Sequence, residues 1–320
     1  MNKFKIQNHG LLQDQRRPKE RITDYVFGAS PVLADILRPD GQWADYLPNK
    51  EYQRQYNFDT MGCVSFSALN CIETLLKAKY NLSINFSDRA LAKASGTTIY
   101  GNTLWQVADT IRSWGLLKEE DWSWLPDIDT WEEYYAFIPS DIQEKRLWFI
   151  SNFNINYEFL LANEEDMVKE ALKYTPLQVT VGFNSVDDNG YYYREGNPIY
   201  NHAITLFGYS DKTYWLVFDQ YDQVIKKVRW DYKFGTLLKY NIIKLNNMLD
   251  IEFVKLKTSP AIYLRIDKTI SPVGSGDTYK ELTGRNDFVF REIEPIEFAT
   301  YSVVSKIWTS ASLNKFISNL

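Results

Sequence analysis

The sequence has very few of the residues that form disulfides and metal sites. Its 320 residues include only two cysteines and two histidines. Cys63 and Cys71 lie in a segment with helical periodicity that would place them about 12 Å apart, beyond the Cα separation of about 7 Å that a disulfide spans. We therefore expect two free thiols. His9 lies in a polar N-terminal segment, far in sequence from His202, so no Cys/His zinc site can be assembled, and no cofactor is expected.

Long apolar runs and a surplus of positive charge are also missing. No stretch of about 18 apolar residues appears, and residues 1–17 contain no apolar segment of signal-peptide length. We therefore expect no membrane contact, no secretion signal, and a location in the cytoplasm or on a virus particle. The formal net charge is −5, with acidic and basic residues mixed along the chain, which argues against nucleic acid as a partner.

What the chain does contain is a globular composition, 45% hydrophobic and 24% charged, with a change of periodicity near residue 176. Residues 59–175 are mainly helical in pattern, whereas β-branched and aromatic residues alternate after residue 176 and predict an antiparallel sheet or barrel. The expected fold class is α+β. One expected helix begins at Cys63, and the others span 87–93, 104–114 and 164–174. The expected strands span 177–183, 202–209, 214–219, 224–230 and 240–245.

Three regions follow from these patterns. Residues 1–40 have few apolar positions in any period and are interpreted as an N-terminal arm. Residues 41–245 contain the helical and the β-rich halves and form the expected main domain. Residues 246–320 include a turn-rich segment and are expected to form a C-terminal accessory module, through which an assembly partner would bind.

Cys63 has the sequence context of an activated thiol. It begins a predicted helix directly after Gly62, where Asp59 or Thr60 can cap the helix and the glycine lets a substrate backbone approach closely. The free N–H groups and dipole at a helix N-terminus favour a thiolate. A cysteine inside an amphipathic helix is more often a small core residue, and that interpretation applies to Cys71.

A base and its orienting group follow in the β-rich half. His202 comes after Asn201 at the start of a predicted strand, and Asp219 ends the next strand. Because neighbouring antiparallel strands lie side by side, we expect the Asp219 carboxylate near the imidazole of His202. Each residue alone has an ordinary structural explanation, but together they match a thiol, a base and an orienting group.

The order and context of these residues resemble the papain family. Residues 63–68 read Cys-Val-Ser-Phe-Ser-Ala, similar to the family's Cys-Trp-Ala-Phe-Ser-Ala. Residues 201–204 read Asn-His-Ala-Ile, similar to its Asp-His-Ala-Val, and 214–221 resemble its segment from Tyr-Trp to Asn-Ser-Trp. The resemblance covers about residues 22–245.

This resemblance implies a two-lobed fold, with a helical left lobe, an antiparallel β-barrel right lobe, and an active-site cleft between them. It implies Cys63 as nucleophile, His202 as base and Asp219 as orienting residue where papain has Asn. The residues that it places along the substrate cleft are Gly62, Gly101, Asn102 and Asn201.

The chain also departs from the family pattern. The oxyanion-hole Gln of the family lies six residues before the cysteine, where this chain has Asn57, while Gln55 lies eight before. Either Asn57 is a shorter donor or an insertion brings Gln55 into place, and we favour Gln55. The family's disulfides and long helical propeptide are missing, so any latency would depend on the short N-terminal arm.

The sequence thus predicts a cysteine peptidase that hydrolyses peptide or isopeptide bonds of a peptide or protein substrate through a Cys63 thioester. Two alternatives stay open. One is a peptidoglycan amidase or endopeptidase that uses the same Cys-His pair, and the other is a non-catalytic papain-fold component of a phage or other assembly.

Overall fold

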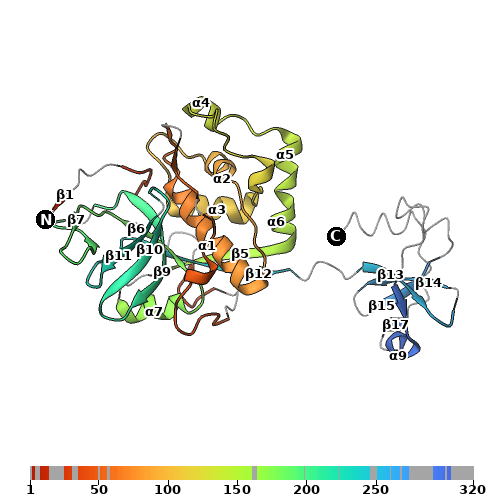
Figure 1. The fold of residues 1–320 in the computed structure, drawn as a ribbon. Coiled ribbons are helices and arrows are strands. Elements are labelled where there is room, and N and C mark those ends of the chain that lie inside the picture. The colour runs from red at the N-terminus through yellow and green to blue at the C-terminus, as the bar shows by residue number, and fades with distance from the viewer. Residues whose placement is uncertain are drawn as a thin grey trace. The chain divides into compact units, whose positions relative to one another are not determined.

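The computed structural model describes residues 2–3, 8–13, 25–30, 35–49, 51–55, 58–160, 164–197, 199–222, 224–245, 251–259, 261–266, 269–273, 291–299 and 301–303. The chain divides into two compact units, Met1–Leu245 and Asn246–Leu320. The first unit contains both a group of helices and a large sheet (Figure 1), which confirms the predicted α+β class. None of the helices in the described part of the chain is long and apolar enough to cross a membrane.

The long helix α1 (Cys63–Tyr80) lies at the centre of the first unit. Every residue from Cys63 to Leu76 is buried, polar ones included. Helices α2 (Asp88–Ala94) and α3 (Leu104–Trp114) pack against α1, and each begins with a side-chain N-cap that satisfies a free N–H of its first turn. The other described helices of this unit are η2 (Ala44–Tyr46), η3 (Glu119–Asp121), α4 (Trp131–Tyr134), α5 (Ser140–Lys145), α6 (Leu147–Asn152) and α7 (Glu165–Leu172).

The sheet of the first unit has the strand order β1-β7-β8-β11-β10-β9-β6-β12-β5-β2 in the described residues. Neighbouring strands are antiparallel except in the β8–β11 and β2–β5 pairs. The order begins at β1 and ends at β2, so the described strands form no closed sheet, and the predicted antiparallel barrel is not confirmed. The strands are β1 (Asn2–Lys3), β2 (Tyr25–Val26), β5 (Phe153–Leu160), β6 (Leu177–Val181), β7 (Ser185–Val186), β8 (Tyr192–Tyr193), β9 (His202–Ser210), β10 (Tyr214–Asp219), β11 (Val224–Arg229) and β12 (Leu237–Lys244).

Strand β5 lies in the segment predicted to be mainly helical. It pairs with β12 along its whole length. Its signal was present in the sequence, because Phe153, Ile155, Tyr157 and Phe159 alternate with less apolar residues and all four are buried. The interpretation of residues 59–175 as mainly helical missed this strand.

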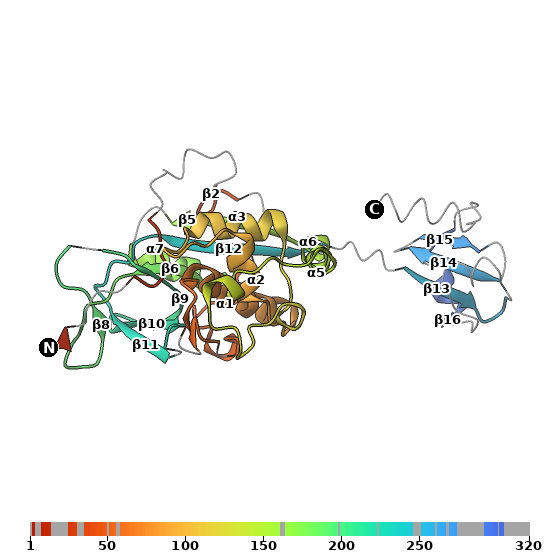
Figure 2. The same ribbon diagram turned by 90° about the horizontal axis from the view of Figure 1, so that it is seen from above.

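Helix α1 packs against the middle of the sheet. Thr205 on β9 donates its hydroxyl to the carbonyl of Ser67 at 3.2 Å, and Gln178 on β6 donates its amide to the carbonyl of Val64 at 2.8 Å. Figures 1 and 2 show α1 between these strands and α2. This packing brings the beginning of α1 to the place where β9 begins and β10 ends.

The second unit has its own sheet, with the order β16-β13-β14-β15-β17. Its small core contains Val254, Ile270 and Ile293. The described elements are β13 (Ile251–Leu256), β14 (Ile262–Ile266), β15 (Thr269–Pro272), β16 (Arg291–Ile293), α9 (Pro295–Phe298) and β17 (Ser302–Val303).

Candidate active site

Cys63 is the first residue of α1 and is completely buried. The turn before it is held by side chains: Asp59 accepts from the N–H of Met61 at 3.0 Å, and Thr60 accepts from the N–H of Gly62 at 3.1 Å. Gly62 is the N-cap, so the capping role considered for Asp59 or Thr60 is replaced by these turn contacts. Because the helix begins at Cys63, the N–H of this residue has no acceptor within the helix.

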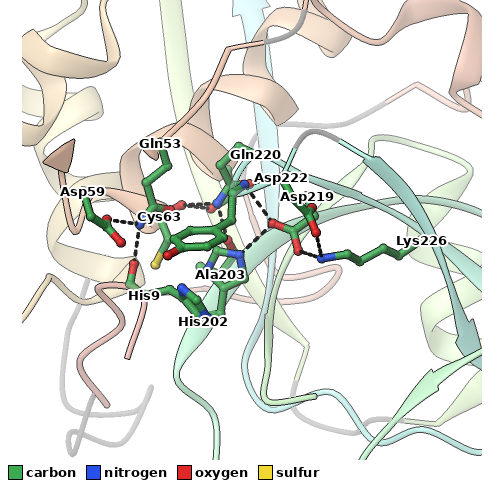
Figure 3. Close-up of polar contacts among 12 residues, drawn as sticks. His9, Gln53, Asp59, Cys63, His202, Ala203, Asp219, Gln220, Asp222 and Lys226 are labelled. Carbon is green, nitrogen blue, oxygen red and sulfur yellow. Dashed lines mark hydrogen bonds and ion pairs between the residues drawn. The ribbon is translucent and has the colours of Figure 1, made fainter. Parts of the chain in front are cut away.

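His202 and Asp219 form a buried pair. Nε2 of the imidazole lies 2.8 Å from Oδ1 of Asp219, and both side chains are almost fully buried (Figure 3). Burial acts to raise the pKa of Asp219, but the charges and hydrogen bonds of His202 and Lys226 outweigh it and hold the pKa well below its ordinary value. The carboxylate is therefore ionised, as an orienting group requires.

The thiol of Cys63 is protonated in this state. Burial raises its pKa, and hydrogen bonding to the backbone of Ala203 and Val64 only partly opposes that effect. The hydrogen bonds of the described residues include none between the thiol and His202, whose buried Nδ1 has no partner there. This raised pKa is the opposite of the thiolate expected from the helix N-terminus, and its largest cause is the desolvation of the fully buried thiol.

The glutamine that lies against the turn before Cys63 is Gln53. Its side chain is completely buried, and Nε2 donates to the carbonyl of His9 at 2.6 Å and to Oδ1 of Asp59 at 3.1 Å (Figure 3). A short hairpin of β3 (Arg54–Gln55) and β4 (Phe58–Asp59) separates it from Cys63 in sequence.

Of the two candidates from the sequence, the one that the structure describes, Gln55, is not at this position. Gln55 lines a separate cavity of about 180 Å³ together with Asp88 and Arg89. Asn57 lies outside the described residues. The hairpin turns the chain back on itself, so Gln53 lies next to Thr60, whose N–H donates to the Gln53 carbonyl. Counting residues back from the cysteine cannot reveal such a loop.

Residues 8–13, here called the N-terminal segment, cross the site. The N–H of His9 donates to the carbonyl of Asn201 at 3.0 Å. Asn102 donates its N–H to the carbonyl of Gly10 at 2.9 Å and accepts from the N–H of Leu12 at 2.8 Å. The segment therefore binds in the manner of an added β-strand, through its backbone.

The fit of this segment is close at its glycine. Gly10 has a φ of 102°, and a Cβ there would lie 1.9 Å from the carbonyl oxygen of Met61. On the facing wall, a Cβ on Gly101 would lie 1.8 Å from the carbonyl oxygen of Gly10. Only glycine at both positions lets the two backbones approach this closely.

The imidazole of His9 adds an aromatic contact to the site. Its ring centroid lies 4.8 Å from that of His202 and 4.1 Å from that of Tyr221. Together with Asn201, Asp219 and Lys226, these residues line a cavity of about 210 Å³. The sequence analysis assigned any latency to the arm as a whole, but it did not single out His9.

The structure thus gathers most of the residues predicted from the sequence. Cys63, His202 and Asp219 lie at the junction of α1, β9 and β10, and the predicted cleft residues Gly101, Asn102 and Asn201 contact the N-terminal segment directly. Gly62 precedes the thiol as expected. Gln53, His9 and Lys226 were not predicted. No group of three or more His, Cys, Asp or Glu side chains in the described ranges is arranged to hold a metal ion.

Comparison of the sequence with known proteins finds no matching family model and no matching curated protein. Comparison of the structure finds digestive procathepsin L 3 from the larval midgut of Tenebrio molitor, which is 17% identical with a TM-score of 0.50 and covers 73% of this chain and 76% of that one. It also finds the cysteine protease and lectin-like domains of a surface layer associated protein of Clostridium difficile, which are 16% identical with a TM-score of 0.51.

That second match covers 76% of this chain and 60% of the other. At these identities the likeness concerns the fold, and it agrees with the motifs around Cys63, His202 and Asp219. The chain therefore has a papain-like fold, the fold of the cysteine peptidases that its sequence resembles.

Proposed function

We propose that this protein is a cysteine peptidase that cleaves peptide or isopeptide bonds through a thioester on Cys63. The observation that supports the proposal most strongly is the carbonyl of His9, which accepts a hydrogen bond from the buried amide of Gln53 at 2.6 Å beside the first turn of α1. A peptide carbonyl thus lies on a fixed donor at the turn that leads into Cys63, and the ring of the same His9 lies 4.8 Å from that of His202. This set of groups is what acyl transfer to sulfur needs.

The reaction follows from these groups. Because Nε2 of His202 faces Asp219, Nδ1 is the nitrogen that takes the proton of Cys63. The sulfur attacks the substrate carbonyl carbon, and the Gln53 amide and the Cys63 N–H stabilise the negative oxygen. The imidazolium then protonates the leaving amine, the C–N bond breaks, and a thioester remains. The neutral imidazole activates water, which hydrolyses the thioester and restores the thiol.

In the state described here the N-terminal segment keeps the site inactive. It occupies the Gln53 donor and the backbone groups of Asn102 and Asn201 that an extended substrate would use. Cys63 is completely buried in this state, and burial raises the pKa of its thiol. Catalysis therefore requires the segment to leave the cleft.

The test uses Gly10→Val in the full chain. Valine at this position clashes with Met61 and requires a left-handed backbone, so the segment cannot seat and peptidase activity should rise at least tenfold over wild type. Hydrolysis of casein and of a fluorogenic peptide library is the measurement, with alkylation of Cys63 followed by peptide mass spectrometry. Gly28→Val is the matched control, because its φ is also positive while nothing lies within 4 Å of the added carbon.

The outcomes separate the three functions. Activity that appears with Gly10→Val and disappears with Cys63→Ser supports the peptidase. Clearing of cell-wall suspensions without casein cleavage assigns the site to peptidoglycan. A third outcome is that the Gly10→Val protein hydrolyses no substrate and is alkylated no faster at Cys63 than at Cys71. In that case the thiol is not a nucleophile and the protein is a non-catalytic papain-fold component.

A further inference from the structure

Lys226 on β11 is a buried cation that neither the sequence motifs nor the proposed reaction accounts for. Only 8% of the residue is exposed. Its Nζ lies 2.5 Å from Oδ2 of Asp219 and 2.8 Å from Oδ2 of Asp222. A buried lysine is costly unless its charge is paired, and here one of the two pairing groups is the carboxylate that contacts His202.

The two oxygens of Asp219 have different partners. Oδ1 faces Nε2 of His202 at 2.8 Å and accepts from the N–H of Tyr221 at 2.9 Å. Oδ2 faces Lys226. Figure 3 shows the carboxylate between the imidazole on one side and the lysine on the other. This division fixes the rotation of the carboxylate, so that Oδ1 stays directed at the ring.

The strand pairing explains why the lysine is in place. β10 and β11 pair antiparallel, with Lys226 opposite Val217 and Asp219 opposite Val224. Lys226 and Asp219 are therefore diagonal neighbours, whose side chains project from the same face of the sheet. The contact depends on two rigid strands, and the half-exposed Asp222 holds the ammonium group from the other side.

We infer that Lys226 is a positioning residue of the active site: it keeps Asp219 ionised and rotated toward His202, so that the other ring nitrogen stays available to Cys63. The inference rests on the proposed peptidase function. Without the lysine, Asp219 would keep a desolvated carboxylate with one cationic neighbour fewer, and its proton affinity would rise. The carboxylate would also gain freedom to turn away from the ring.

The test compares Lys226→Met, which keeps the length of the side chain and removes the charge, with Lys226→Gln, which keeps a hydrogen-bond donor without charge. Both are made in the full chain that carries Gly10→Val, so that the cleft is open. We expect kcat to fall at least tenfold for Met and less for Gln, with KM within about threefold of the parent. The acid limb of the kcat profile should move to higher pH, because Asp219 becomes easier to protonate.

The groups that face Lys226 must be considered in that pH profile. Besides Asp219 and Asp222, the ring of Tyr192 lies 5.1 Å from Nζ, and His9, His202 and Tyr221 line the same cavity. Asp222→Asn serves as the control, since it removes the outer carboxylate and leaves the Asp219 contact. A shift of the acid limb with Lys226→Met that Asp222→Asn does not reproduce assigns the effect to the Lys226–Asp219 pair.

A purely structural lysine gives a different result. It would lower the unfolding temperature in both variants while kcat and the acid limb of the folded enzyme stay at parent values, and that result would overturn the inference. If Lys226→Met does not fold, Lys226→Gln decides by the same criteria. If the Gly10→Val parent shows neither peptidase activity nor selective alkylation of Cys63, the proposed function itself is refuted. If that parent is active but substitutions at Lys226 do not change kcat, only the inference about Lys226 is refuted.

Discussion

At the scale of single residues, Gln53 and Gln55 show how closely spaced side chains come to lie in different environments. The amide of Gln53 is buried against the carbonyl of His9, whereas Gln55 lines the cavity that also contains Asp88. Gln55 is the second residue of β3, whereas Gln53 precedes the strand, so the alternation that would put residues two apart on one side does not extend to Gln53. The choice between them thus depends on where strand β3 begins.

This contrast gives a prediction about the oxyanion. In the open Gly10→Val chain, Gln53→Ala should lower kcat by about 10²–10³ with little change in KM, since one donor to the developing negative charge is lost. Gln55→Ala is the matched control and should leave kcat within about twofold. Steady-state kinetics on a peptide substrate provides the measurement. Equal losses from the two substitutions, or a larger loss from Gln55→Ala, would show that Gln53 is not the donor.

At the scale of elements, the N-terminal segment contains the group that makes its binding depend on pH. Burial, followed by the charge of His202, lowers the pKa of His9 to about 3, and Lys226 and Arg54 act in the same direction while Asp219 opposes them. A released His9 has its ordinary pKa near 6.5. The bound state therefore takes up fewer protons, so segment binding is strongest above about pH 6.5 and weakens as the pH falls toward about 3.

The expected consequence is release of the segment in acid. We compare the rate of Cys63 alkylation in wild type with the rate in Gly10→Val, whose segment is already released. The ratio of the two rates should rise as the pH falls from about 7 to 4, because acid releases the wild-type segment. His9→Phe keeps an aromatic ring but does not titrate. The ratio of the Cys63 alkylation rate in His9→Phe to that in the double variant with Gly10→Val should therefore change little with pH. A wild-type ratio that is flat over this range would contradict the titration of His9 as the cause.

The helices and strands around the site follow from local pattern. The predicted bounds 104–114 and 214–219 agree with α3 and β10, because amphipathic periodicity and strand alternation are encoded within each segment. Predicted and observed ends differ by one or two residues at α2 and α7. Strand β5 was missed although its alternation is local, because that alternation follows directly after the short helix α6 in a segment interpreted as mainly helical.

At the scale of the whole molecule, the two units have separate cores. The described core of the first unit surrounds α1, and that of the second consists of Val254, Ile270 and Ile293 with partly buried neighbours. We therefore predict that residues 1–245, produced alone with Gly10→Val, fold cooperatively and hydrolyse small peptides at the rate of the full chain. Thermal unfolding and peptide kinetics are the measurements. A fragment that does not fold, or that loses activity while folded, would show that residues 246–320 support the catalytic unit.

The sequence by itself determined the α+β class, through periodicity that is encoded within each segment. Short contiguous motifs carried the papain-like resemblance and the prediction of Cys63, His202 and Asp219 as site residues. The tertiary structure decided the rest. The hairpin places Gln53 against the carbonyl of His9, and strand pairing places Lys226 against Asp219. Residues 8–13 are held by backbone hydrogen bonds that any sequence with a glycine at the close approach can make. Only the folded arrangement also fixes how deeply the thiol is buried, and that burial is the largest cause of its raised pKa.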